Sequence, residues 1–135
     1  MTNKQISKAC CFAVNKLKNR DIHERIYNFV IAVLRLLADL PKNNFNLIII
    51  DQCGRAVTSV GANDQEADAC ESRRDFIAKY SLVKKEIKEV NYWLRLIFDL
   101  NKDFQTRVAV IQQEGKEILL IVSSIIKNTK KSKKI

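Results

Sequence analysis

The chain has 135 residues, of which 47% are hydrophobic, so it is long enough for one compact core and too short for two ordinary domains. Only three glycines and one proline are present, which excludes the many chain reversals of a β-sandwich or a β-barrel. The net charge of +9 suggests an anionic partner such as a nucleic acid, and its distribution along the chain matters more than its size.

The positive charge is concentrated at the two ends of the sequence. Residues 1–20 and 127–135 each hold five basic residues and no acidic one, whereas residues 21–126 hold 14 basic residues against 15 acidic ones. The body is therefore nearly neutral. Three alternatives are open for the basic ends: they bind RNA or DNA phosphates, they bind an anionic membrane surface, or they contact only water. The predicted nucleic-acid-binding residues are Lys4, Lys8, Lys16, Lys18, Arg20, Lys127, Lys130, Lys131, Lys133 and Lys134.

No stretch of the sequence predicts a membrane span or a secretion signal. The two most apolar stretches, residues 29–38 and 118–126, fall short of the roughly 20 residues that cross a bilayer. The apolar patch at residues 9–14 is followed by Asn15 and Lys16, where a signal peptide needs a longer apolar region and a cleavage site. We therefore expect a soluble, cytoplasmic protein.

The four cysteines are expected to be buried or half-buried reduced thiols. Cys10, Cys11, Cys53 and Cys70 have no CxxC spacing and no histidine partners, so neither a zinc site nor redox chemistry is predicted. A helical core of this size needs no disulfides, and a thiol behaves there as a small apolar group. No metal or other cofactor is expected.

Apolar residues recur at alternating spacings of four and three, which is typical of helices that pack along a shared seam. The first segment with this pattern spans about residues 21–40. Asp21 and Glu24 are placed as an N-cap and its capping-box partner, and Pro41 follows the last apolar residue. We expect the first helix to run from about Asp21 to Leu40.

A second amphipathic helix is predicted for about residues 46–69. Gly54 and Gly61 lie beside its apolar stripe in mid-helix, where glycine weakens a helix. We therefore expect another helix to approach closely at these two residues.

Two further helices complete the predicted fold. The third begins at about Ser72, with Asp75 as an approximate capping-box partner, and keeps the longest strict register over residues 76–97. The fourth keeps the register over residues 104–125. Short connections make sequential helices lie antiparallel. The sequence therefore predicts an all-α, up-down-up-down antiparallel four-helix bundle of residues 21–127.

Two basic segments flank this bundle. Residues 1–20 form an N-terminal extension in which apolar residues keep the helical spacing, so an extra helix there either packs on the bundle or stays loose. Residues 128–135 have no periodicity and are expected to be a disordered basic tail.

The first and third helices each carry a second apolar stripe outside the main seam. Large apolar patches on a small protein usually mark an interface, so we expect a homo-oligomer. Two alternatives are open: the N-terminal segment covers these residues, or the aromatic ones stack on bases. The predicted interface residues are Tyr27, Ile31 and Leu34 on the first helix and Tyr92, Trp93 and Leu96 on the third.

Two blocks of sequence resemble a known family over about residues 21–100. With them the chain resembles the proteins encoded within intervening sequences of bacterial 23S ribosomal RNA genes. The residues that carry the resemblance are Gln52, Arg55, Thr58-Ser59, Ala62-Asn63 and Glu66-Ala67 in the first block, and Ser72 to Ile77, Lys85-Glu86, Lys88-Glu89 and Tyr92 to Leu96 in the second.

The resemblance implies a four-helix bundle that assembles as a ring-like homopentamer and has no known catalytic activity. It also implies an accessory role, since some relatives act beside reverse transcriptases in diversity-generating retroelements, where a basic surface contacts nucleic acid. The chain departs from the family pattern at Cys53-Gly54, where bulkier aliphatic residues are usual, and at Asp64, where an aromatic residue is common. These departures concern local packing.

A set of polar residues on the second and third helices is expected to form a network that fixes the register of these helices. No nucleophile with a base beside it is present in the set, which favours structure over catalysis. The predicted members are Arg55, Ser59, Asn63 and Glu66 on the second helix and Lys85, Glu86 and Glu89 on the third.

No enzyme activity is expected from this sequence. His23 is the only histidine and is predicted to be an exposed residue in the first turn of a helix. A single histidine leaves no room for an HExxH zinc site or a di-iron bundle, and no glycine-rich phosphate loop is present.

The predicted function is that of a homo-oligomeric scaffold or accessory protein whose basic ends bind RNA or DNA without reading sequence. A rival hypothesis is a protein–protein interaction module that docks onto a partner such as a reverse transcriptase. A third is a passive protein kept by a mobile or intervening element.

Overall fold

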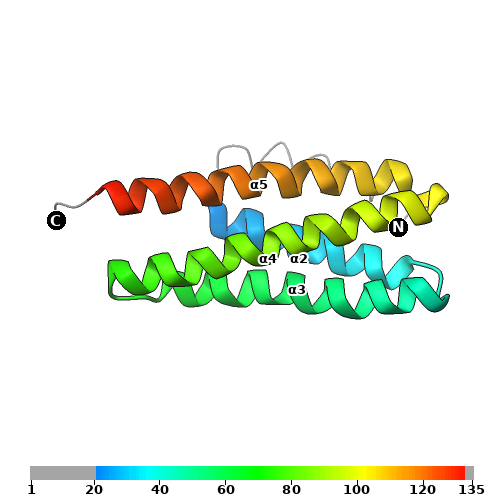
Figure 1. Cartoon of the computed structure of the whole chain (residues 1–135), viewed down its shortest axis with the longest axis horizontal. Coiled ribbons are helices and arrows are strands. Elements are labelled where there is room, and N and C mark those ends of the chain that lie inside the picture. The colour runs from blue at the N-terminus through cyan, green and yellow to red at the C-terminus, as the bar shows by residue number, and fades with distance from the viewer. Residues whose placement is uncertain (1–20, 133–135) are drawn as a thin grey trace.

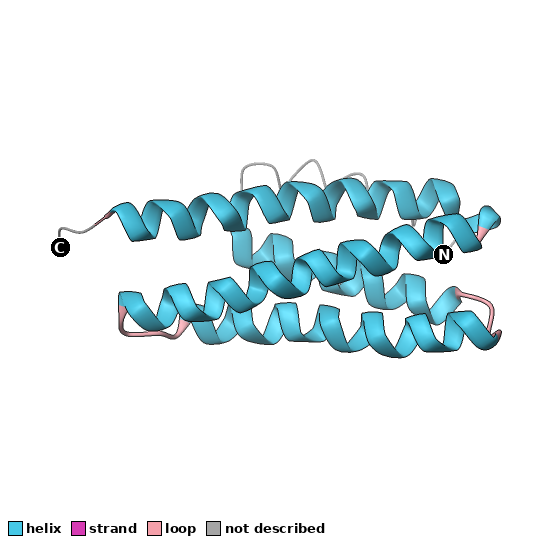
Figure 2. Cartoon of the chain, in the orientation of Figure 1, coloured by secondary structure: helices cyan, strands magenta, loops and turns pink. Residues whose placement is uncertain are grey.

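The computed structural model describes residues 21–132 of the chain. Within this range, successive long helices run antiparallel to one another, and no strand is present (Figure 1, Figure 2). The elements are α2 (Ile22–Asp39), α3 (Asn44–Asp68), α4 (Arg73–Leu100), the short 3-10 helix η1 (Lys102–Phe104) and α5 (Gln105–Lys131). The predicted four-helix bundle is confirmed, and the extra N-terminal helix predicted within residues 1–20 lies outside the described residues.

Side-chain caps explain where three of the helices begin. The carboxylate of Asp21 accepts a hydrogen bond from the backbone N–H of His23, and the hydroxyl of Ser72 accepts one from Asp75, so both predicted caps are confirmed. The side chain of Asn43 caps α3 in the same way. Because of this cap, α3 begins two residues earlier than its apolar pattern indicates.

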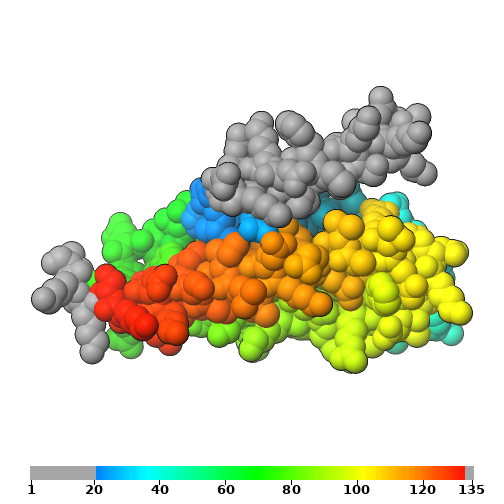
Figure 3. Space-filling view, turned by 90° about the horizontal axis from the view of Figure 1, so that it is seen from above, coloured from blue at the N-terminus to red at the C-terminus, as the bar shows by residue number. Residues whose placement is uncertain are grey.

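The four helices pack in a ring, so that each contacts two neighbours. Figure 3 looks onto α5, with α4 along one of its edges and α2 along the other. The predicted seam residues form the core, in which Tyr80 and Phe29 are the largest buried side chains. Cys53 is also buried, and burial raises the pKa of its thiol to about 12.

The last helix is longer than its sequence pattern predicted. α5 continues to Lys131, so residues 128–131 are helical rather than part of a disordered tail. The hydroxyl of Thr129 donates to the carbonyl of Ile125, and cations on the last turn interact favourably with the negative end of the helix dipole. Figure 1 shows these last turns of α5 running past the start of α2.

The glycines differ in how closely a neighbouring helix approaches them. A Cβ on Gly61 would lie 3.4 Å from Val30 of α2, which agrees with the predicted close approach. At Gly54 the nearest atom would be 3.8 Å away, an ordinary contact, so the prediction is wrong there. The tightest site is Gly115 of α5, where a Cβ would overlap the side-chain oxygen of Asn91 on α4.

None of the described helices combines the length and the hydropathy of a membrane span.

Candidate nucleic-acid interface

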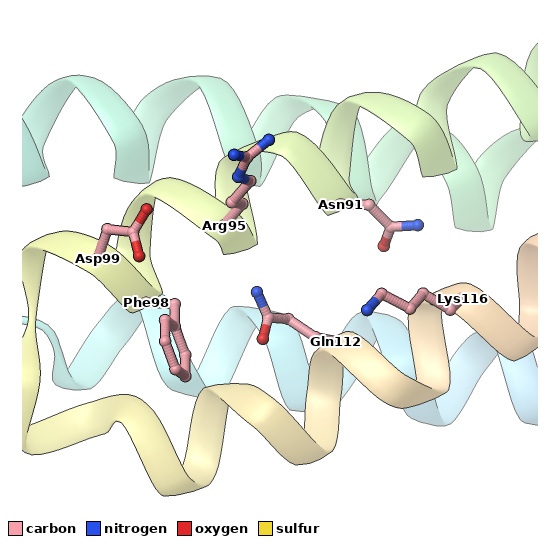
Figure 4. A pocket seen from close by; sticks show the side chains of 6 residues that line it. All are labelled: Asn91, Arg95, Phe98, Asp99, Gln112 and Lys116. Atoms are coloured by element: carbon pink, nitrogen blue, oxygen red, sulfur yellow. The ribbon is translucent and has the colours of Figure 1, made fainter.

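Basic side chains line a groove between α4 and α5. Arg95 of α4 and Lys116 of α5 border a cavity of about 350 Å³ in this groove (Figure 4). Lys88 and Lys84 precede Arg95 by about two and three helical turns, so they lie on the same face of α4. The α4 side of the groove therefore carries a line of three cations.

The α5 side extends this line to the end of the helix. Lys127 and Lys130 follow Lys116 by about three and four turns and share its face. At about 1.5 Å per residue, the line of cations is roughly 25 Å long. We call its six members the basic row: Lys84, Lys88, Arg95, Lys116, Lys127 and Lys130.

The charges of the basic row are not neutralised by acids among residues 21–132. All six side chains are exposed or half-buried, and none of them forms an ion pair with another described residue. Among the residues that line the cavity, Asp99 is the only acid. A line of unpaired like charges along a groove produces a positive potential that attracts a polyanion.

The acids of α5 lie on its other edge, which faces α2. Glu114 accepts hydrogen bonds from Nε and Nη2 of Arg25, and Glu117 lies 3.6 Å from the same Nη2. Arg25 is 6% exposed and Glu114 is 9% exposed. The hydrogen bond to Glu114 is the main reason that the pKa of Arg25 is raised. Both acids are therefore paired with a cation inside the bundle.

Of the predicted nucleic-acid-binding residues, the structure describes Lys127, Lys130 and Lys131, which are exposed on the last turns of α5. The other members, Lys4, Lys8, Lys16, Lys18, Arg20, Lys133 and Lys134, lie outside the described residues. The cations of α4 and Lys116 were not predicted, because the summed charge of residues 21–126 is close to zero. Their spacing along the two helices is the signal that could have identified them.

The predicted polar network between α3 and α4 is largely replaced by other contacts. In the described part of the chain, Glu66 is its only α3 member that reaches α4, where its carboxylate lies 2.6 Å from Nζ of Lys79. Arg55 pairs with Asp51, and Asn63 donates to the carbonyl of Ser59, so these contacts stay within α3.

The α4 members of that network also lack their predicted partners. Glu89 accepts a hydrogen bond from Trp93, and burial followed by the charge of Glu89 raises the pKa of Glu86. Lys85 is exposed. The prediction is wrong for contacts between the two sets, because the end of α3 lies opposite the start of α4, where Lys79 is the nearer cation.

The predicted interface residues fall into two groups. Tyr27 is 62% exposed and Tyr92 is 54% exposed, whereas Leu34, Trp93 and Leu96 pack partly against the core. Ile31 is half-buried. The two tyrosines are thus the members that present the most apolar surface to solvent.

An apolar patch that was not predicted lies where α3 begins and α4 ends. Phe45 and Ile48 of α3 and Leu100 of α4 are exposed there. Reciprocal hydrogen bonds between the carboxamides of Asn46 and Asn101, at 2.8 and 3.1 Å, hold these two helix ends together. Leu96 and Trp93 precede Leu100 by about one and two turns, so they continue the patch along α4. We call the patch of Phe45, Ile48, Trp93, Leu96 and Leu100 the α3/α4 patch.

His23 is not the exposed residue that the sequence predicted. Its side chain is 22% exposed, and its Nδ1 lies 2.8 Å from Oδ1 of Asp64, which is 1% exposed. The hydroxyl of Tyr80 donates to the same oxygen at 2.8 Å. These contacts join α2, α3 and α4 through one oxygen of Asp64, whereas its buried Oδ2 has no hydrogen-bond partner among the described residues.

The acids around His23 change its titration. Burial lowers the pKa of His23, but the hydrogen bond to Asp64 and the charges of Asp64, Asp21 and Asp68 outweigh burial, so that the pKa is raised. Burial, together with Asp64, raises the pKa of Tyr80 and keeps its hydroxyl a hydrogen-bond donor. Within residues 21–132, no cluster of His, Cys, Asp or Glu has the arrangement of a metal site.

Comparisons with known proteins agree with this fold. A family model described as 23S rRNA-intervening sequence protein matches residues 18–124 of the chain. The chain is also similar to the crystal structure of a protein of unknown function from the S23 ribosomal protein family of Bacteroides thetaiotaomicron. The two are 30% identical, the match covers 79% of this chain and 99% of that one, and the TM-score is 0.72. No curated protein matches the chain.

Proposed function

The chain belongs to the 23S rRNA-intervening sequence protein family, and we propose that it binds the phosphate backbone of nucleic acid along the basic row, without reading sequence. The observation that carries this proposal is the line of six cations along the α4/α5 groove, none of which pairs with an acid in the described part of the chain. Phosphate contacts from lysine and arginine supply most of the affinity in non-specific binding. The basic ends of the chain add further contacts of the same kind.

Salt dependence tests this proposal directly. Each phosphate that a cation neutralises contributes about 0.7 to the slope of log K against log salt for a single strand, and about 0.9 for a duplex. We expect the double variant Lys84→Ala/Lys88→Ala to bind RNA more weakly and to lower this slope by roughly 1.5. The measurement is a fluorescence anisotropy titration of a labelled RNA at several salt concentrations.

A matched control removes two exposed cations from other faces of the bundle. Arg35 of α2 and Arg55 of α3 are exposed and lie outside the α4/α5 groove. We expect Arg35→Ala/Arg55→Ala to retain the affinity and the salt slope of the unmodified protein. If both double variants lose the same affinity, only the net charge matters and the basic row is not the binding surface.

The proposal includes self-association through apolar surface, with the ring-like pentamer that the family resemblance implies. The α3/α4 patch and the exposed rings of Tyr27 and Tyr92 support it, because contiguous apolar surface on a small protein usually marks an interface. The patch and the basic row lie on different flanks of α4, so both can be occupied at once. Native mass spectrometry tests this part: five copies support a ring, and a monomer contradicts it.

In this proposal the protein acts as a non-enzymatic accessory factor in the bacterial cytoplasm, and a reverse transcriptase is one candidate partner. The rival function, a module that binds only a protein partner, makes a different prediction for the basic row. A partner bound through the bundle surface alone would still be recovered by Lys84→Ala/Lys88→Ala in a pull-down after nuclease treatment. Loss of recovery after nuclease treatment of the unmodified protein would instead indicate that nucleic acid bridges the two.

A further inference from the structure

The cavity in the α4/α5 groove contains groups that phosphate binding does not need. Figure 4 shows the carboxamides of Asn91 and Gln112 and the ammonium of Lys116 in the gap between the two helices. The lining is completed by an aromatic ring, a carboxylate and a guanidinium. The lining residues are Asn91, Arg95, Phe98 and Asp99 of α4 and Gln112 and Lys116 of α5.

These groups match a nucleotide better than a lone phosphate. A phosphate offers only acceptor oxygens, so it is attracted by Arg95 and Lys116 but repelled by Asp99. A base edge offers both donors and acceptors, which carboxamides and a carboxylate can pair with. The face of a base also packs against an aromatic ring such as that of Phe98.

The side chain of Asn91 supplies a second observation. Its Oδ1 is buried and has no hydrogen-bond partner among the described residues. The oxygen lies against Gly115, which has no Cβ to push it away. Because Gly115 closes in this oxygen, the carboxamide of Asn91 meets a ligand in the cavity through its Nδ2 group, which is a donor.

The size of the cavity is consistent with one nucleotide. Its volume of about 350 Å³ falls within the range of about 300–1,000 Å³ that small-ligand sites occupy. Resting on the proposed function, we infer that the cavity takes one unstacked nucleotide of a single strand, with its base between Phe98 and the carboxamides and its backbone along the basic row. A base in a duplex stays paired and stacked and does not enter such a cavity.

The experiment compares a single-stranded RNA of mixed sequence with the duplex of the same length, by anisotropy at one salt concentration. We expect the single strand to bind about tenfold more tightly, in line with the contribution of one base stacked on an aromatic side chain. Gln112→Ala and Phe98→Leu should each reduce this preference several-fold and leave duplex binding unchanged. Helical circular dichroism checks that each variant is folded.

Asp99→Ala gives the sharpest test, because two models predict opposite signs. If binding is only electrostatic, removing this negative charge strengthens the binding of both RNAs. If Asp99 accepts a hydrogen bond from the bound nucleotide, its loss weakens single-strand binding and leaves duplex binding the same or stronger. Lys88→Ala, which removes a backbone contact, should weaken both.

The outcomes separate this inference from the proposed function. Equal affinity for single strand and duplex, or an Asp99→Ala variant that binds the single strand as well as or better than the unmodified protein, overturns the nucleotide cavity. The proposed function survives that result if Lys88→Ala still weakens both RNAs. Failure of the unmodified protein to bind either RNA overturns both.

Discussion

The acids of α5 and the lysines of its basic row lie on opposite edges of the helix, and they differ in burial and in pairing. Toward α2, its acids are buried or half-buried and paired with Arg25. Toward α4, its lysines are exposed and are not paired within the described structure. A buried charge must be paired, because removing it from water is costly, whereas an exposed charge can remain free. One helix thus separates charges that hold the bundle together from charges that are available to a ligand.

The largest expected loss of stability comes from removing Arg25, the buried cation of α2 that pairs with the acids of α5. In Arg25→Ala, the carboxylate of Glu114 stays buried without its partner. Breaking a buried ion pair from one side costs about 3–5 kcal/mol. We expect the free energy of unfolding, measured by urea denaturation, to fall by about this amount.

Arg107→Ala is the matched control, since Arg107 of α5 also pairs with an acid of α2. Its Nη1 lies 2.7 Å from the carboxylate of Asp39, but both side chains are exposed. Exposed pairs contribute about 0–1 kcal/mol, so this variant should lose little stability. Equal losses in the two variants would show that burial does not distinguish the pairs.

A pair of glycine variants tests how closely α4 approaches α5. In Gly115→Ala, the new Cβ meets Asn91 and lies 3.3 Å from Phe29, and this overpacking outweighs the gain in helix propensity. We expect a net loss of roughly 1 kcal/mol in the free energy of unfolding. Gly54→Ala, whose Cβ has room, should gain roughly 0.5–1 kcal/mol. A stable Gly115→Ala variant would mean that the two helices are farther apart.

The periodicity of the sequence predicted the helices and the core, but not which polar groups meet. Spacing within one helix shows which residues share a face, as it did for the caps at Asp21 and Ser72 and for the buried seam. It does not show the register between helices distant in sequence. The pairing of Arg25 with Glu114 and of His23 with Asp64 depends on that register. The basic row, in contrast, has regular spacing along its helices. It was missed because the charge of residues 21–126 was summed, and that sum is close to zero.

The pH dependence of stability tests the polar contact between α2 and α3. The pKa of His23 is raised in the folded protein above its usual value of 6.5, so the folded state favours the protonated ring. The resulting stabilisation is fully present below about pH 6.5 and is lost as the pH rises through the higher folded pKa. We expect the free energy of unfolding to fall over this interval. His23 is the only histidine, so His23→Gln should abolish this step, and a step that persists would have another origin.

The smallest expected change in stability follows from removing two cations of the basic row on α4. Lys84 and Lys88 have no ion-pair partner among the described residues, so their loss leaves no buried acid without a partner. The free energy of unfolding of Lys84→Ala/Lys88→Ala should therefore lie within about 0.5 kcal/mol of that of the unmodified protein, while its affinity for RNA falls. Urea denaturation and anisotropy on the same preparation measure both quantities. If stability and affinity fall together, the cations of the basic row contribute to the bundle as Arg25 does, and the separation between structural charges and binding charges is wrong.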